Sequence, residues 1–194
     1  MSLIPAFELG LWNAWILVIP ILILSFSDMG VTAARESGGS GEPEDFQLTK
    51  KENRLTYAVF LPMFVSWVYA VFLPLQLGTT WLITGLIIYL LGIAFTIVAI
   101  RNFATSPKDK VITKGLYSVT RNPTYIGMVL MQTGLGIACA SWLYLLLAAV
   151  LTILLNANLT AEERYCLYKY GEDYRKYKNK TPRWIGIPKS AKKE

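Results

Sequence analysis

The sequence predicts an all-α, polytopic membrane protein with five transmembrane helices, and three observations support this fold class. The chain of 194 residues is 54% hydrophobic and only 16% charged, whereas soluble domains carry about 25% charged residues. Five apolar stretches are each close to the roughly 17 to 25 residues that a spanning helix needs, and they lie at 9–27, 55–77, 79–100, 124–140 and 141–158. All 19 Lys and Arg residues follow the first, third or fifth stretch. We therefore expect one integral-membrane domain over residues 1–194, without a Rossmann domain.

The first apolar stretch, 9–27, is interpreted as a permanent transmembrane helix rather than as a signal peptide. No Lys or Arg precedes Arg35, so the basic segment that begins a signal peptide is missing, and the sequence around Ser27-Asp28 is a poor cleavage site. Residues 28–54 contain the run ESGGSGEPED, whose small, proline and acidic residues are typical of a linker. A flexible cytoplasmic loop is expected there.

The other four stretches are predicted to form two helical hairpins. A Leu-Gly-Thr turn separates the second stretch from the third, and a junction at Ala140-Ser141 separates the fourth from the fifth. Pro62 and Pro74 fall within the second stretch, where each is expected to kink the helix. Gly134 and Gly136 fall within the fourth, where small residues favour close packing of membrane helices.

The distribution of basic residues predicts the orientation of the chain. Four lie between the first and second stretches, five between the third and fourth, and ten after the fifth. Because cytoplasmic loops are enriched in Lys and Arg, the N-terminus is expected outside the cell and the C-terminus in the cytoplasm. The net charge of +6 then follows from topology and from attraction to anionic membrane lipids, so no nucleic-acid partner is expected.

The chain has two cysteines and no histidine, which limits the chemistry it can perform. Cys139 and Cys166 are expected at opposite sides of the membrane and cannot pair. The usual ligand sets for zinc or iron–sulfur clusters are missing, so no metal is expected. The commonest general base is also missing, which leaves Glu, Tyr or Lys for any proton transfer.

The start of the fourth stretch is a candidate anion-binding site. Pro123 suits the first position of a helix, and Asn122 suits the N-cap before it. The same geometry presents free backbone N–H groups and the positive end of the helix dipole at the cytoplasmic boundary. Arg121 can pair there with a lipid headgroup or an anionic ligand, and Tyr117 and Tyr125 flank the turn.

A second polar cluster follows the fifth stretch. Thr160 to Glu163 matches a capping box, which gives Glu163 a structural role and leaves Glu162 as the better functional carboxylate. Beyond it, Leu167, Tyr170, Tyr174 and Tyr177 recur at helical spacing, interrupted near Gly171. We expect a cytoplasmic amphipathic helix that lies on the membrane or covers a site between the fourth and fifth spans.

In this order and spacing, the motifs resemble those of the integral-membrane isoprenylcysteine carboxyl methyltransferases and the related phospholipid N-methyltransferases. The family pattern has (V/I)T-x-G-x-Y, R-H-P-x-Y-x-G, a membrane hairpin, an E-E pair and F-G-x-x-Y-x-x-Y. This chain has ITKGLY at 112–117, RNPTYIG at 121–127, the pair Glu162-Glu163, and YGEDYRKY at 170–177. The resemblance covers about residues 95–188, the expected catalytic half, and suggests a short prokaryotic form.

The resemblance implies S-adenosylmethionine as the methyl donor and S-adenosylhomocysteine as its product, held at the cytoplasmic end of the fourth and fifth spans. By position, the expected cofactor-binding residues are Asn102, Asp109, Lys110, Val111, Ile112, Tyr117, Asn122, Pro123, Thr124, Tyr125 and Glu162. Arg121 and Asn158 would orient the acceptor, and with Glu162 they are the catalytic candidates. The family's R-H-P histidine is Asn122 here, and Asn158 stands where the family has an arginine for the substrate carboxylate.

The expected function is methylation of the carboxylate of a prenylated cysteine, or of a similar lipidic acceptor that enters from the bilayer. A carboxylate is already ionised at neutral pH, and in-line displacement chiefly requires positioning, whereas an amine acceptor needs a base. The alternatives are a phospholipid or small-amine N-methyltransferase on the same scaffold, a thiol methyltransferase, a nicotinamide-dependent sterol-type reductase, and a lipid-binding membrane scaffold.

Overall fold

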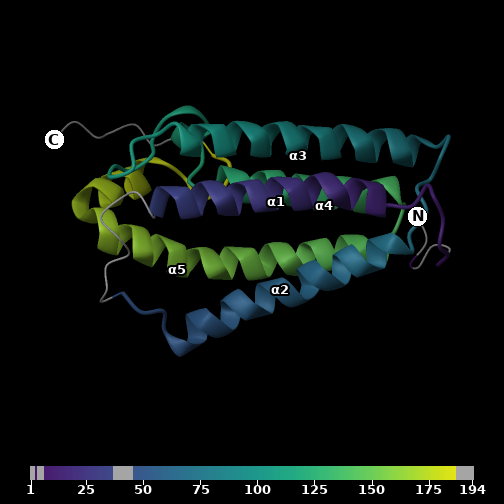
Figure 1. Cartoon of the computed structure of the whole chain (residues 1–194), viewed down its shortest axis with the longest axis horizontal. Coiled ribbons are helices and arrows are strands. Elements are labelled where there is room, and N and C mark those ends of the chain that lie inside the picture. The colour runs from purple at the N-terminus through teal and green to yellow at the C-terminus, as the bar shows by residue number, and fades with distance from the viewer. Residues whose placement is uncertain (1–2, 4–6, 37–45, 187–194) are drawn as a thin grey trace.

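The five α-helices in the described part of the chain run alternately in opposite directions, so that successive connections lie at opposite ends of the bundle (Figure 1). The structure is a computed structural model, and it describes residues 3, 7–36 and 46–186. The helices are α1 (Trp15–Glu36), α2 (Lys50–Val71), α3 (Thr80–Ala104), α4 (Pro123–Ala138) and α5 (Trp142–Lys180), with a short 3₁₀ helix η1 (Gly115–Ser118) before α4. Within the described residues no strand occurs, so the predicted all-α class is confirmed.

Four of these helices, α1, α2, α3 and α5, are long and apolar enough to cross a membrane. α4 has 16 residues and is about 24 Å long, which is shorter than a typical span. It nevertheless has the largest buried fraction of the five helices, with nine of its 16 residues buried. The last turns of α1 and α3 and the first turns of α2 and α4 lie together, and we call this end of the bundle the basic end (Figure 1).

The structure places α1 later in the chain than the predicted span at 9–27. Asn13 holds the preceding segment out of the helix, since its amide donates to the carbonyls of Glu8 (2.6 Å) and Val71 (2.8 Å). At its other end α1 continues to Glu36, so the prediction of a loop beginning at residue 28 was wrong. Asp28 therefore lies inside a transmembrane helix. The linker residues 37–45 lie outside the described residues.

α2 also differs from the predicted span at 55–77. It begins at Lys50 because Thr49 and Glu52 form a capping box, and it ends at Val71. A proline disfavours helical geometry at the residue before it, so Pro74 is incompatible with a longer α2. Pro74 itself lies beyond the helix, in an isolated bridge with Asn13. Pro62 is inside the helix, but the prediction that Pro74 is also inside was wrong.

α3 and α4 approach so closely that only glycine fits at their interface. A Cβ at Gly85 would lie 2.3 Å from the backbone nitrogen of Ala138, and one at Gly134 would lie 2.5 Å from that of Tyr89. Gly92 and Gly127 make a second contact of the same kind, one heptad away on each helix. The packing role predicted for Gly134 is confirmed. The second contact, between Gly92 and Gly127, lies near the start of α4 and fixes it at the basic end.

α5 covers 39 residues in two helical segments joined by a kink, and it extends far beyond the predicted span at 141–158 and includes the predicted amphipathic helix. Thr160 is in its interior, so the predicted capping box at that position was wrong. Gly171 interrupts the helix with φ 55° and ψ −127°, which turns the last segment back over the bundle. The hydroxyl of Tyr177 then donates to the carbonyl of Tyr117 at 2.7 Å.

Candidate active site

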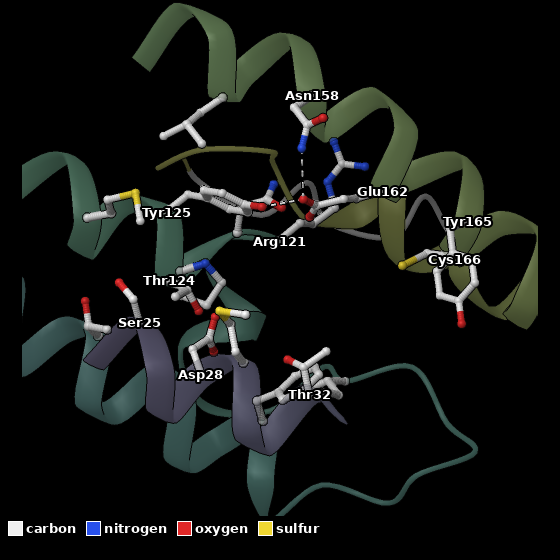
Figure 2. Close-up of a pocket in the computed structure, with 18 of the residues that line it drawn as sticks. Ser25, Asp28, Thr32, Arg121, Thr124, Tyr125, Asn158, Glu162, Tyr165 and Cys166 are labelled. Atoms are coloured by element: carbon white, nitrogen blue, oxygen red, sulfur yellow. Dashed lines mark hydrogen bonds between the residues drawn. The ribbon is translucent and has the colours of Figure 1, made fainter. Parts of the chain in front are cut away.

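A cavity of about 1030 Å³ lies among α1, α2, α4, α5 and the 108–117 segment, toward the basic end of the bundle. This volume is at the upper limit of ordinary small-molecule sites. Figure 2 shows the polar groups of this cavity, with Glu162 and Asn158 on α5, Tyr125 and Thr124 on α4, and Asp28 on α1.

Glu162 is held in the cavity wall by neighbours from two helices. The hydroxyl of Tyr125 donates to the Glu162 carboxylate, and the Asn158 amide lies 3.5 Å from the same oxygen. The Asn158 carbonyl oxygen in turn accepts from the hydroxyl of Thr56 on α2 at 3.0 Å. Three sequence-predicted residues, Tyr125, Asn158 and Glu162, are thus linked into one hydrogen-bonded group that faces the cavity.

Arg121 supplies positive charge at the same end of the cavity. Its side chain is only 8% exposed, and its Nη2 lies 3.1 Å from Glu163 Oε1. Its Nε and Nη1 are buried and have no hydrogen-bond partner among the described residues. Because Arg121 lies two residues before Pro123, the first residue of α4, these free donors add to the positive end of that helix dipole. The arrangement favours an anionic group of a ligand.

Glu163 faces away from Glu162 and is the centre of an ion-pair cluster. Its side chain is 4% exposed and contacts Arg121, Lys178 (2.9 Å) and Arg183 (2.7 Å). The hydrogen bond to Glu163 raises the pKa of Arg183 above its ordinary value. The cluster ties the segment after α5 to the start of α4, and it holds Arg121 in place.

Asn122 begins α4, but its side chain does not cap the helix. The prediction of Asn122 as the N-cap residue is confirmed, but its amide donates to the carbonyl of Arg183 at 2.9 Å and makes no capping hydrogen bond. The prediction of Pro123 as the first helical residue is confirmed. Asn122 therefore also fastens the C-terminal segment to α4.

Most of the sequence-predicted site residues line this one cavity. They are Lys110, Val111, Ile112, Tyr117, Arg121, Asn122, Pro123, Thr124, Tyr125, Asn158 and Glu162. Burial raises the pKa of Tyr117 well above its ordinary range, so its hydroxyl stays protonated. The cavity wall does not include Asn102, which packs beneath Gly115, or Asp109, which is exposed in the loop after α3.

Comparison with known proteins identifies the family to which this arrangement belongs. A model of the phospholipid methyltransferase family, named PEMT, matches residues 67–173, more than half of the chain. The chain belongs to this family. The match includes α3, α4 and most of α5, and the membrane methyltransferase resemblance expected from the motifs is thereby confirmed.

Two curated relatives resemble parts of this chain. The chain is 31% identical over 78 residues to the protein-S-isoprenylcysteine O-methyltransferase of Schizosaccharomyces pombe, a match that covers 40% of this chain and 32% of the relative. It is 35% identical over 78 residues to methanethiol S-methyltransferase 1 of Bradyrhizobium diazoefficiens, which covers 40% of this chain and 26% of the relative. The matches thus span about a third or less of these relatives.

The apolar part of the cavity reaches the outer surface of the bundle. Phe26 and Met29 on α1 and Phe60 and Phe64 on α2 line the cavity, and all four are also between 56% and 68% exposed. Side chains that are both cavity-lining and exposed mark an opening. In a bilayer this opening, which lies between α1 and α2, faces lipid.

The cavity also contains functional candidates that the motif analysis missed, all on α1 and outside the family match. They are Ser25, Asp28, Thr32 and Arg35. Their spacing of three, four and three residues places them on one face of the helix. This helical spacing is visible in the sequence, but it was missed because the first span was expected to end at residue 27.

Proposed function

We propose that this protein is an S-adenosylmethionine-dependent methyltransferase whose lipidic acceptor enters the cavity from the bilayer. The observation that carries the proposal is the division of one cavity into two parts. Its polar end presents Arg121 and Glu162, and its apolar part opens between α1 and α2. A charged cofactor and a lipidic acceptor can therefore meet inside one cavity.

The polar end fits the amino-acid part of S-adenosylmethionine. The unpartnered Nε and Nη1 of Arg121 and the start of α4 suit its carboxylate, and Glu162 suits its ammonium group. Tyr117, Thr124 and the 110–112 stretch line the adjoining wall and would enclose the rest of the molecule. When bound, this cofactor supplies an electrophilic methyl group.

The side chains of the protein would act mainly by positioning. Tyr125 and Asn158 fix the orientation of Glu162, and Thr56 fixes Asn158. Tyr174 and Tyr177, both buried after the break at Gly171, line the cavity and would exclude water from it. Holding two reactants in the reactive geometry is a large contribution that a protein makes to such a displacement.

The named activities of the relatives leave several acceptors possible for this chain. The carboxylate of a prenylated cysteine agrees with the name of the fission-yeast relative, and Arg121 could orient that group. A thiol agrees with the name of the bacterial relative, and a phospholipid, for example through an amine in its head group, agrees with the family description. Asn158 occupies the position where the resemblance predicts an arginine. Because Asn158 is uncharged, it cannot form an ion pair that would select an acceptor with a carboxylate.

We further propose that α4 is the fifth crossing and that the basic end lies in the cytoplasm. The described Lys and Arg residues lie on the last turns of α1 and α3, the first turns of α2, the 105–122 connection and the chain after Ala161, all at one end (Figure 1). This asymmetry is typical of the cytoplasmic side. It also gives that face an affinity for anionic lipids.

Calorimetric titration of the detergent-purified protein with S-adenosylhomocysteine tests this proposal. Wild type should bind with micromolar affinity, Glu162→Ala should lose binding, and Glu172→Ala, an exposed control on the same helix, should bind like wild type. Absence of binding to wild type would overturn the cofactor assignment and favour the scaffold alternative. Equal binding by Glu162→Ala would overturn the role of Glu162.

A further inference from the structure

One face of α1 carries polar residues in the half of the helix nearer the basic end. Ser25, Asp28, Thr32 and Arg35 all line the cavity, while the opposite faces of α1 are apolar. Ionisable side chains within transmembrane helices are rare, and they usually face an internal cavity that has a function. The cavity-facing stripe of α1 therefore requires an explanation that the motifs of α4 and α5 do not supply.

Arg35 already has partners elsewhere, so it does not neutralise the stripe. Its Nη1 donates to the carbonyls of Phe103 (2.7 Å) and Ser106 (2.6 Å), and its Nη2 donates to that of Pro107 (2.9 Å). The guanidinium also stacks on the ring of Phe103, 4.6 Å from its centroid. Arg35 thus caps the end of α3.

Asp28, by contrast, forms no hydrogen bond or ion pair with any residue that the structure describes. It lines the cavity, and Figure 2 shows it on α1, facing Thr124 and across the cavity from Glu162. Its neighbours Phe26 and Met29 belong to the lipid-facing opening. A carboxylate at this place would meet the polar head of an acceptor as it enters from the membrane.

We propose that Asp28 is a specificity-determining residue that binds a protonated amine on the lipidic acceptor and discriminates against acceptors with a carboxylate. An ammonium group gains a charge-assisted hydrogen bond with Asp28, and a carboxylate is repelled by Asp28 and Glu162 together. This inference rests on the proposed function and identifies the acceptor class as a long-chain amine.

The transfer balances with the groups that this proposal names. The acceptor ammonium first gives one proton to the Asp28 carboxylate, and the nitrogen lone pair then forms a bond to the methyl carbon of the sulfonium donor. The carbon–sulfur bond breaks, and its electron pair stays on sulfur as the neutral thioether of S-adenosylhomocysteine. The positive charge moves to the methylated nitrogen, and the proton on Asp28 passes to water.

The test compares two acceptor probes with the same tail, dodecylamine and dodecanoate. Each is titrated calorimetrically into the protein loaded with S-adenosylhomocysteine, in nanodiscs of zwitterionic lipid. The variants are Asp28→Asn, which keeps the shape and removes the charge, and Asp28→Glu, which keeps the charge. Asp173→Asn, an exposed aspartate, is the matched control.

Wild type should prefer dodecylamine, and Asp28→Asn should bind it about tenfold more weakly or worse, as expected for loss of a charge-assisted hydrogen bond. Asp28→Glu should recover part of this affinity, and Asp173→Asn should match wild type. In parallel, mass spectrometry after incubation with methyl-labelled donor should find N-methyldodecylamine from wild type and much less from Asp28→Asn.

Affinity for S-adenosylhomocysteine separates the possible failures. If wild type does not bind it, the proposed function itself fails. If wild type binds it but Asp28→Asn does not, Asp28 holds the cofactor and the acceptor role is overturned. Equal affinity of wild type and Asp28→Asn for dodecylamine, or a wild-type preference for dodecanoate, would also overturn the proposal.

Discussion

Glu162 and Glu163 show how one step along a helix separates two roles. Consecutive residues on an α-helix point about 100° apart, so Glu162 faces the cavity and Tyr125 while Glu163 faces three basic side chains. Glu162 was predicted as the functional carboxylate because a capping box was expected to occupy Glu163. That capping box does not exist, since Thr160 lies inside α5. The ion-pair cluster could not be predicted, since Arg183 and Arg121 lie far from Glu163 in the sequence.

Replacing Glu163 by Gln should destabilise the protein much more than a surface charge change. Arg121 would be left buried without its counterion, and removing one partner of a buried pair costs about 3 to 5 kcal/mol. Because Lys178 and Arg183 are partly exposed, we expect a loss near 3 kcal/mol, measured by thermal unfolding in detergent. Glu172→Gln breaks only an exposed pair with Arg175 and should cost less than about 1 kcal/mol. Equal losses in the two variants would contradict the role of Glu163 as the centre of the cluster.

At the scale of the helices, apolar patterning predicted which elements exist and how they pair, but not where several of them end. The ends of α1 and α2 depend on Asn13, Pro74 and the capping box at Thr49. The contacts of Asn13 with Val71 and with Pro74 bring together segments about sixty residues apart in the sequence, so no local sequence pattern predicts them. The error at α1 had a functional cost, since it placed Asp28 in a loop.

Gly134→Ala tests the close contact of α3 and α4. The added methyl would lie 2.5 Å from backbone that cannot move aside independently, so we expect destabilisation of about 1 to 3 kcal/mol or more. Gly30→Ala is the control, because nothing lies within 4 Å of its added Cβ and alanine favours a helix interior by about 1 kcal/mol. Thermal unfolding of both variants should therefore shift in opposite directions. A wild-type melting curve for Gly134→Ala would show that the two helices lie farther apart.

At the scale of the whole molecule, the cavity and the described basic residues lie at the same end of the bundle. The motifs predicted a site at this end, and the predicted polar residues of α4 and α5 line the cavity there. The contribution of α1 could not be predicted in the same way, because it lies outside the motifs and depends on how the bundle closes.

Labelling from one side of the membrane tests the orientation of the molecule. Leu77→Cys lies in the connection between α2 and α3, and Asn179→Cys lies near the end of α5, both exposed; each is made with Cys139 and Cys166 replaced by Ser. An impermeant maleimide should label Leu77→Cys in intact cells and Asn179→Cys only in inverted vesicles. The reverse pattern would place the cavity on the outer side.

For the lipidic acceptor proposed above, the position of the cavity at one end of the bundle determines which lipids can reach it. Its opening between α1 and α2 begins near Phe26 and Phe60, so only molecules in the nearer leaflet present their head groups at Asp28 and Glu162. A lipid in the opposite leaflet must first flip across the bilayer. Methylation by this protein would therefore build compositional asymmetry between the leaflets, and the rate of lipid flipping would set how quickly the whole membrane is modified.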